Sequence, residues 1–201
     1  GMDTTQSPVA QFTSTMPTLQ GYTRTAFLCF FISHIPITLL VDGQAFFPRH
    51  YYPQLLRDVV DWYAITFKDK LMTHPHEPWF SSLVTLEVLL QLPFFFLAVY
   101  ALLQQPKLKK NEESGEQNNN ALVRGDGLFR SLCMIYGSMT ATTLIPIFAS
   151  FLLDGDTTVR EKGVLMGFYL PYFIFPLWLV VIAVCEENVF GHSKEEGKKA
   201  R

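Results

Sequence analysis

Four long apolar segments, each nearly free of charged residues, constrain the fold of this chain more than any other feature. A helix needs about 20 apolar residues to cross a hydrocarbon core about 30 Å thick. The apolar residues run continuously rather than alternating, which excludes the β-barrel, the other structure that satisfies its backbone in lipid. The sequence therefore predicts an all-α membrane protein, a bundle of four transmembrane helices. The expected spans cover about residues 25–47, 79–103, 128–153 and 163–185.

The distribution of Lys and Arg predicts the orientation of the bundle. Four spans place both chain termini on one side, and ten basic residues fall on that side against six on the other. Cytoplasmic segments carry the excess of Lys and Arg, so both termini are expected in the cytosol. Residues 1–23 are a polar N-terminal tail, 24–186 the membrane domain, and 187–201 a cytosolic tail. The charged, Asn-rich segment 104–127 is expected to be a flexible cytosolic linker.

The segment between the first two spans, residues 48–78, carries aromatic and aliphatic residues at helical spacing. One interpretation is an amphipathic helix that lies on the lumenal interface or caps the bundle. The other is a short helix that merely joins two spans. The aromatic content favours the first, because Trp and Tyr suit the membrane interface.

The chain ends in Lys198-Lys199-Ala200-Arg201. Lysines at the third and fourth positions from the C-terminus resemble a dilysine retrieval signal, which acts only on a cytosolic tail. The alternative is an ordinary basic tail that enforces topology. The first interpretation predicts the endoplasmic-reticulum membrane, with nuclear or other endomembranes as further locations.

Polar side chains inside the spans predict an internal site. Glu87 lies roughly 12 Å into the second span, and Gln91 follows at i+4 on the same helix face. In the first span His34, Thr38 and Asp42 repeat that spacing and form a second polar stripe. Ionisable groups are expensive in lipid, so both stripes are expected to face the interior of the bundle.

The third and fourth spans add polar residues, and every span contains proline. Proline removes a backbone hydrogen bond and bends a helix, so the helices are expected to pack less tightly at their middles. The prediction is a cavity inside the bundle with apolar walls and a few polar groups. Among these polar residues are Ser138, Thr140, Thr142 and Thr143 of the third span, and Tyr169 and Tyr172 of the fourth.

Two carboxylates a few Å apart in a low dielectric do not both ionise, so Asp42 and Glu87 are expected to share one proton. Such a site suits an apolar amine, or a sterol whose hydroxyl needs an acceptor. The alternative is that Glu87 stays protonated and bonds only a neighbouring helix, and His34 by itself is more often a packing or hydrogen-bonded residue. No pair of Cys and His has metal-ligand spacing, so neither a metal site nor another cofactor is predicted. A net charge of -2 without a basic-aromatic patch argues against nucleic acid as a partner.

Short motifs in all four spans and in the segment after the first span together resemble one family of membrane proteins. They are Ile32-Ser33-His34-Ile35-Pro36-Ile37-Thr38-Leu39-Leu40, Tyr52-Pro53, Trp62-Tyr63-Ala64, Phe67-Lys68-Asp69, Gln91-Leu92-Pro93-Phe94-Phe95, Thr142-Thr143-Leu144-Ile145-Pro146, Tyr169, Pro171-Tyr172 and Pro176. The chain is similar, over about residues 24–185, to the sigma-2 receptor (transmembrane protein 97) family. The N-terminal extension, the expanded linker and the tail depart from that pattern. They suggest a distant, fungal member, where the name efficient mitochondria targeting-associated protein is used.

The resemblance implies a fold, a set of ligands and roles for individual residues. The family shares its EXPERA domain with emopamil-binding sterol isomerase and has an occluded cavity that lipid can reach. It binds amines and sterols or oxysterols, and it dimerises. By motif position Asp42 would pair with a ligand cation, Glu87 would hydrogen-bond to Asp42, and Asp69 matches a second aspartate whose loop position suggests a structural role. The remaining residues expected to bind the ligand are His34, Tyr63, Gln91, Thr143 and Tyr172.

Three functions follow from these expectations. The leading one is a non-enzymatic receptor that binds sterol-like and cationic amphiphilic ligands, influences sterol homeostasis or trafficking, and has membrane lipid and a sterol-transport membrane protein as partners. The second is a sterol isomerase in which the same carboxylates move protons. The third is a quality-control factor that assists mitochondrial precursor targeting without a small ligand.

Overall fold

The computed structural model describes residues 18–113, 125 and 127–191, and every regular element in these residues is helical. Four stretches are long and apolar enough to cross a membrane, which confirms the predicted four-span, all-α fold. The chain is therefore a multi-pass membrane protein. The four spans are Gly21–Ala45, Pro78–Gln105, Gly127–Leu153 and Val159–Cys185.

The first and last spans differ from the predicted segments at their ends. The first contains α2 (Gly21–Leu40), which gives way to a 3-10 turn, η1 (Asp42–Ala45), so regular α-helix ends well before residue 47. The last span, α8 (Val159–Cys185), begins four residues before the predicted residue 163. Thr158 and Glu161 form a capping box there, which satisfies backbone N–H groups at the start of the helix. The third span, α7 (Gly127–Leu153), begins one residue before the prediction.

The second span has three parts: α4 (Pro78–Leu86), a π-helical turn, η4 (Glu87–Gln91), and α5 (Leu92–Glu113). Helix α5 continues to Glu113, so the first part of the predicted flexible linker is helical instead. The remainder of that linker, most of the N-terminal tail, and Lys198 and Lys199 lie outside the described residues.

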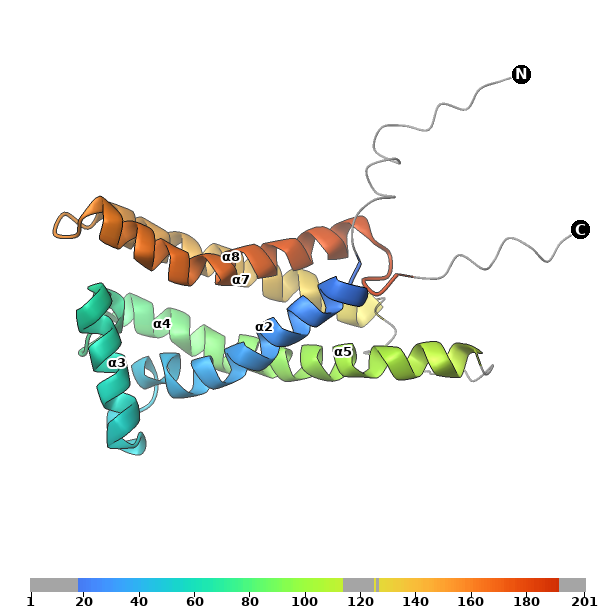
Figure 1. Ribbon diagram of the computed structural model, residues 1–201, viewed down its shortest axis with the longest axis horizontal. Helices are drawn as coiled ribbons and strands as arrows, with labels where there is room; N and C mark the ends of the chain where they lie inside the picture. The colour runs from blue at the N-terminus through green and yellow to red at the C-terminus, as the bar shows by residue number, and fades with distance from the viewer. Residues whose placement is uncertain (1–17, 114–124, 126, 192–201) are drawn as a thin grey trace, which may run out of the picture.

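The α7–α8 pair forms one side of the bundle, and α2 crosses the α4–α5 span on the other (Figure 1). Gly137 of α7 brings the first pair close together. A Cβ at this position would lie 2.5 Å from the Pro176 carbonyl oxygen and 2.5 Å from Cγ2 of Val180. Small residues of this kind allow membrane helices to approach at backbone distance.

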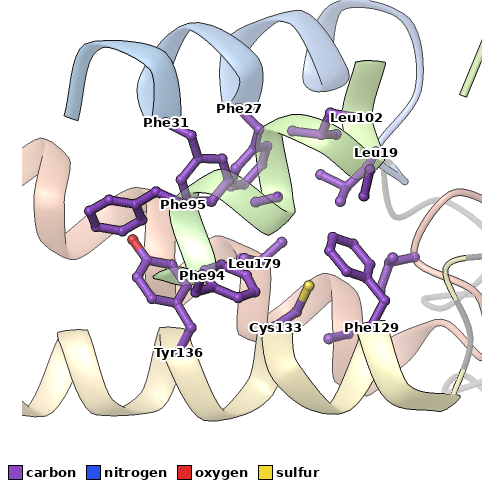
Figure 2. Close-up of a cluster of buried hydrophobic side chains, with 14 of the residues drawn as sticks. Leu19, Phe27, Phe31, Phe94, Phe95, Leu102, Phe129, Cys133, Tyr136 and Leu179 are labelled. Atoms are coloured by element: carbon purple, nitrogen blue, oxygen red, sulfur yellow. The ribbon is translucent and has the colours of Figure 1, made fainter. Parts of the chain in front are cut away.

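The half of the bundle nearer the chain termini is filled mainly by aromatic side chains (Figure 2). Phe31 from α2, Phe95 from α5 and Tyr136 from α7 are almost fully buried there. The rings of Phe94 and Tyr136 stack with their centroids 4.4 Å apart. A second apolar cluster, around Phe80 and Leu144, fills part of the other half.

Helix α3 (Gln54–Phe67) crosses that other end of the bundle (Figure 1). Its Val60 and Ala64 are buried in the second apolar cluster, so α3 packs as a cap and does more than join two spans. The 3-10 turns η2 (Arg49–Tyr51) and η3 (Lys70–Met72) flank it.

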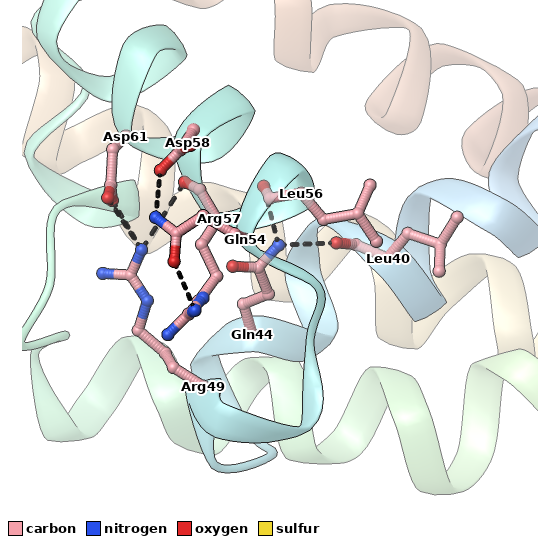
Figure 3. A network of polar contacts seen from close by, with 8 residues as sticks. All are labelled: Leu40, Gln44, Arg49, Gln54, Leu56, Arg57, Asp58 and Asp61. Atoms are coloured by element: carbon pink, nitrogen blue, oxygen red, sulfur yellow. Dashed lines mark hydrogen bonds and ion pairs between the residues drawn. The ribbon is translucent and has the colours of Figure 1, made fainter.

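Polar contacts fasten the chain around this cap to itself and to α2 (Figure 3). Arg49 Nη2 lies 2.8 Å from both carboxylate oxygens of Asp61. Gln44 donates to the carbonyl oxygens of Leu40 and Leu56 at 2.7 and 3.3 Å. The segment after α3 is tied to the α7–α8 connection by the Lys70–Asp154 ion pair at 2.8 Å.

Candidate functional site

A cavity of about 220 Å³ lies between the spans beneath α3. Its walls are mainly apolar side chains, among them Ile37, Val84, Leu144 and Ile147. The structure places all seven residues that were predicted to bind a ligand on its walls, although their role in binding stays a prediction. These residues are His34, Asp42, Tyr63, Glu87, Gln91, Thr143 and Tyr172.

The two carboxylates share one end of this cavity with an imidazole. One ligand atom from each of His34, Asp42 and Glu87 can be chosen so that all three lie within 4.8 Å of one another. Nε2 of His34 lies 3.4 Å from Oε1 of Glu87. Three polar groups from the first and second spans therefore meet in a space that is otherwise largely apolar.

Thr38 takes the place of Asp42 as the direct partner of Glu87. Its buried hydroxyl donates a hydrogen bond to Glu87 Oε1 at 2.5 Å. The family resemblance implied a direct Glu87–Asp42 hydrogen bond, and within the described part of the chain no such bond is formed. The reason is geometric: Thr38 faces Glu87 across the α2–η4 contact, while Asp42 lies one helical turn further on, in η1.

The π-helical turn η4 carries the two polar residues of the second span that line the cavity, Glu87 and Gln91. The Leu92 N–H donates to the carbonyl oxygen of Glu87, an i to i−5 bond that closes the wider turn. Pro93 follows immediately and has no N–H to continue the ladder. π turns inside α-helices occur frequently at functional sites, and here the turn begins at Glu87 and ends at Gln91.

The third span contributes fewer polar groups to the cavity than the sequence predicted. Thr140 is buried and donates to Gln91 Oε1 at 2.9 Å, which fixes the amide. Thr143 lines the cavity beside it. Ser138 and Thr142 are exposed on the other face of α7, where the Thr142 hydroxyl donates to the Ser138 carbonyl. Their expected place in the interior was wrong, because positions 138 and 142 share a face that 140 and 143 do not.

Asp69 lies outside the cavity and supports its wall. The carboxylate is fully buried and accepts hydrogen bonds from the Tyr169 hydroxyl at 2.9 Å, the Tyr63 hydroxyl at 3.3 Å and the Leu71 N–H at 3.0 Å. Burial raises the pKa of Asp69 above its ordinary value, and these hydrogen bonds act in the opposite direction. Since both tyrosines line the cavity, Asp69 holds the side of the cavity that lies under α3.

Sequence reasoning did not include Thr38, Thr140 or Tyr169 among the ligand-binding residues. The signal for Thr38 was present, because it lies midway between His34 and Asp42 in the i, i+4, i+8 stripe. Its partner on another span could not be identified from that spacing.

Comparison with known proteins identifies the family of this chain. The family model for EBP, described as EXPERA (expanded EBP superfamily), matches residues 55–183. The chain belongs to the EXPERA superfamily. Among curated relatives, this EXPERA chain is 36% identical to sigma intracellular receptor 2 of Xenopus tropicalis over 183 residues, covering 87% of this chain and 94% of the relative. The human protein of the same name is 35% identical over 181 residues, covering 85% and 91%.

A more distant similarity extends to fungi. Efficient mitochondria targeting-associated protein 19 of Saccharomyces cerevisiae is 28% identical over 165 residues, covering 78% of this EXPERA chain and 94% of the relative. The identity to the vertebrate proteins confirms the resemblance to the sigma-2 receptor family. Those relatives are named as receptors, and this chain is a membrane protein of the same family.

Proposed function

We propose that this EXPERA protein binds apolar ligands that carry a single cationic amine or a hydroxyl group, such as cationic amphiphiles and sterol-like molecules. One observation carries the proposal: Asp42, Glu87 and His34 converge at one end of a cavity with mainly apolar walls. A small number of polar groups in an apolar cavity fixes the orientation of a ligand, while the walls supply most of the contact area.

The electrostatics of the carboxylates favour a cation. Two ionised carboxylates this close repel one another, and a ligand ammonium between them relieves that repulsion. At about 4 Å and an effective dielectric constant of about 20, one charge pair contributes about 4 kcal/mol. Thr38 holds Glu87, which leaves Asp42 as the carboxylate that is free to meet the ligand.

The volume of the cavity limits how much of a ligand it holds. Drug-sized ligands occupy pockets of about 300–1,000 Å³, and this cavity measures about 220 Å³. We expect the polar end of a long ligand to enter the cavity while its apolar remainder reaches between the helices towards lipid. Side chains on the wall, such as Tyr172 and Phe168, would then change rotamer on binding.

Equilibrium binding of a tritiated amphiphilic amine to the purified protein tests this proposal. Asp42→Asn keeps the shape of the side chain and removes the charge, so affinity should fall at least about 100-fold, which corresponds to about 2.7 kcal/mol. Asp154→Asn is the matched control, because Asp154 is outside the cavity and pairs with Lys70. Equal affinities of the wild type and the Asp42 variant would refute the carboxylate site.

We further propose that the protein resides in the endoplasmic-reticulum membrane with both termini in the cytosol, forms a homodimer, and acts in sterol homeostasis beside a sterol-transport membrane protein. The charge bias and the names of the vertebrate relatives support this placement. Replacing Lys198 and Lys199 together by Ser tests the retrieval signal. The variant should leave the reticulum, and an unchanged distribution in cell imaging would contradict the signal.

A second candidate function is sterol isomerisation, which membership of the expanded EBP superfamily favours. In that reaction an acid protonates a double bond and a base removes a proton elsewhere on the ring system. Incubation of the pure protein with a Δ8-sterol separates the two functions. A Δ7 product that disappears in Glu87→Gln would establish the enzyme, and no conversion by a preparation that binds ligand would favour the receptor.

A further inference from the structure

The imidazole of His34 lacks a good hydrogen bond at both ring nitrogens. The residue is 5% exposed and lines the cavity. No described residue offers a partner to Nδ1. Nε2 is 3.4 Å from Glu87 Oε1, which exceeds the usual 2.7–3.2 Å of an N–H···O bond. The nitrogen that faces the carboxylates, Nε2, is therefore without a well-formed hydrogen bond, and a cation held between it and the carboxylates would satisfy it.

We propose that His34, Asp42 and Glu87 form a binding site for a divalent transition-metal cation of the Zn²⁺ class. The sequence predicted no metal site because no pair of Cys and His has metal-ligand spacing along the chain. The three groups come instead from α2, η1 and η4, and the fold alone brings their ligand atoms within 4.8 Å of one another.

The distances suit tetrahedral coordination. Zinc binds imidazole nitrogen and carboxylate oxygen at about 2.0–2.2 Å, which places neighbouring ligand atoms of a tetrahedron about 3.4 Å apart. The His34–Glu87 separation already has this value, at 3.4 Å. The carboxylate oxygen of Asp42 lies within 4.8 Å of the other two ligand atoms and has only to move closer to them. Asp42 is the first residue of the 3-10 turn η1, which follows α2. The cavity supplies the open fourth position.

Charge balance also favours a dication. One imidazole and two carboxylates with a divalent cation form a neutral set, so neither carboxylate remains as an uncompensated charge in a low dielectric. One nitrogen and two oxygens are the donors that Zn²⁺ accepts readily, whereas Mg²⁺ and Ca²⁺ prefer oxygen alone. Mg²⁺ and Ca²⁺ are therefore the cations that this site should bind least well.

Neighbouring side chains orient two of the three ligands. Thr38 donates to Glu87 Oε1 at 2.5 Å. The His34 ring lies against Phe95 and Tyr172, with centroid separations of 4.5 and 4.6 Å. Partners that fix ligand orientation in this way strengthen metal binding.

The metal site shares the cavity with the proposed amine ligand but does not depend on that proposal. Both cations need Asp42, so zinc and amine should exclude one another. Zinc binding is measured in the absence of amine, and amine binding is measured after treatment with a chelator. Either proposal can therefore fail while the other stands.

The test is a zinc titration of the full-length protein in detergent after treatment with a chelator and dialysis, with ZnCl₂ alone as the probe. We expect one zinc per chain by elemental analysis. Removing an outer-shell partner typically weakens a metal site about 10–100-fold, so removing a ligand in His34→Gln or Asp42→Asn should weaken it more. Zinc should also raise the thermal midpoint of the wild type and leave that of both variants unchanged.

The control is His76→Gln, because His74 and His76 form a pair of surface imidazoles with ring centroids 5.6 Å apart. Zinc binding that is lost in this control, or that is equal in the wild type and His34→Gln, would overturn the proposal. If His34→Gln and Asp42→Asn both fail to fold, Co²⁺ bound to the wild type decides. An intense visible band typical of tetrahedral cobalt supports the site, and a weak octahedral spectrum overturns it.

Discussion

Thr38→Val tests the contact that orients the carboxylate cluster. Valine matches threonine in shape and removes only the hydroxyl. Thr38 is 0% exposed, and its hydroxyl donates to Glu87 Oε1 at 2.5 Å. Without the Thr38 hydroxyl, Glu87 Oε1 keeps as its neighbour only His34 Nε2, which is 3.4 Å away. The substitution should therefore destabilise the α2–η4 contact and leave the surrounding apolar packing in place.

The expected magnitude lies near the upper end of values measured for membrane proteins. Hydrogen bonds to charged groups contribute about 1.5–3 kcal/mol in soluble proteins. Side-chain hydrogen bonds between membrane helices average about 0.6 kcal/mol and reach about 1.7 kcal/mol. Complete burial, the carboxyl acceptor and the 2.5 Å distance favour the upper value, so we expect about 1.5 kcal/mol, or roughly a tenfold change in the unfolding equilibrium.

A double-mutant cycle measures the interaction energy between Thr38 and Glu87 separately from the other effects of each substitution. The free energy of unfolding is measured in mixed micelles for the wild type, Thr38→Val, Glu87→Leu and the double variant, because leucine removes the acceptor oxygen that glutamine would keep. Thr142→Val is the matched control, since Thr142 is exposed and its hydroxyl donates to a backbone carbonyl of its own helix. Independent sites add to within about 0.3–0.5 kcal/mol. A Thr38–Glu87 coupling energy below about 0.5 kcal/mol would refute the assigned contact.

Three further predictions concern stability, each measured by thermal unfolding in detergent. Gly137→Ala should destabilise the protein by about 1–3 kcal/mol, because the added methyl group overpacks against α8. Gly155→Ala is the control and should not destabilise it, since a Cβ there would meet nothing within 4 Å. Burial raises the pKa of Asp69, so its contribution to stability is present below the ordinary carboxyl pKa of about 3.9 and lost as pH rises through the folded-state value. The thermal midpoint of the wild type relative to that of Asp69→Asn should therefore fall as the pH rises above about 4. A difference that rises with pH would contradict this sign. Lys70→Ala should shift the thermal midpoint little, because Lys70 pairs with Asp154 and Asp156 at the exposed surface. A large shift that persists in high salt would contradict that expectation.

The number of spans and the polar helix faces could be predicted from the sequence because both are local properties. Hydropathy over about 20 residues identifies a span without knowledge of its neighbours. Spacing of i, i+4 placed His34 and Asp42 on one face of the first span, and Glu87 and Gln91 on one face of the second. The requirement to keep charge out of lipid then turned both faces inwards, and the structure places all four residues on one cavity.

Contacts between residues far apart in the chain could not be predicted in this way. The Thr38–Glu87 bond joins positions 49 residues apart, and the Thr140–Gln91 bond has the same separation. A threonine in an apolar helix more often donates to a carbonyl one turn earlier, as Thr142 does. The Thr140 hydroxyl lies 2.9 Å from both kinds of acceptor, Gln91 Oε1 and the Tyr136 carbonyl oxygen. Spacing along one helix therefore does not tell which threonines also face a neighbouring helix, as the exposed Ser138 and Thr142 show.

The two carboxylates lie where regular α-helix stops, and this explains why the cavity forms at that depth. Asp42 begins the 3-10 turn η1, and Glu87 begins the π turn η4. Proline in each span predicted bends but not their position, since Pro36 lies six residues before Asp42 and Pro93 six residues after Glu87. A change of helical pitch on two neighbouring spans moves their side chains out of register at one level. Asp42, Glu87 and Gln91 of the irregular turns line the space at this level, so the acidic groups face the cavity where the backbone departs from α-helix.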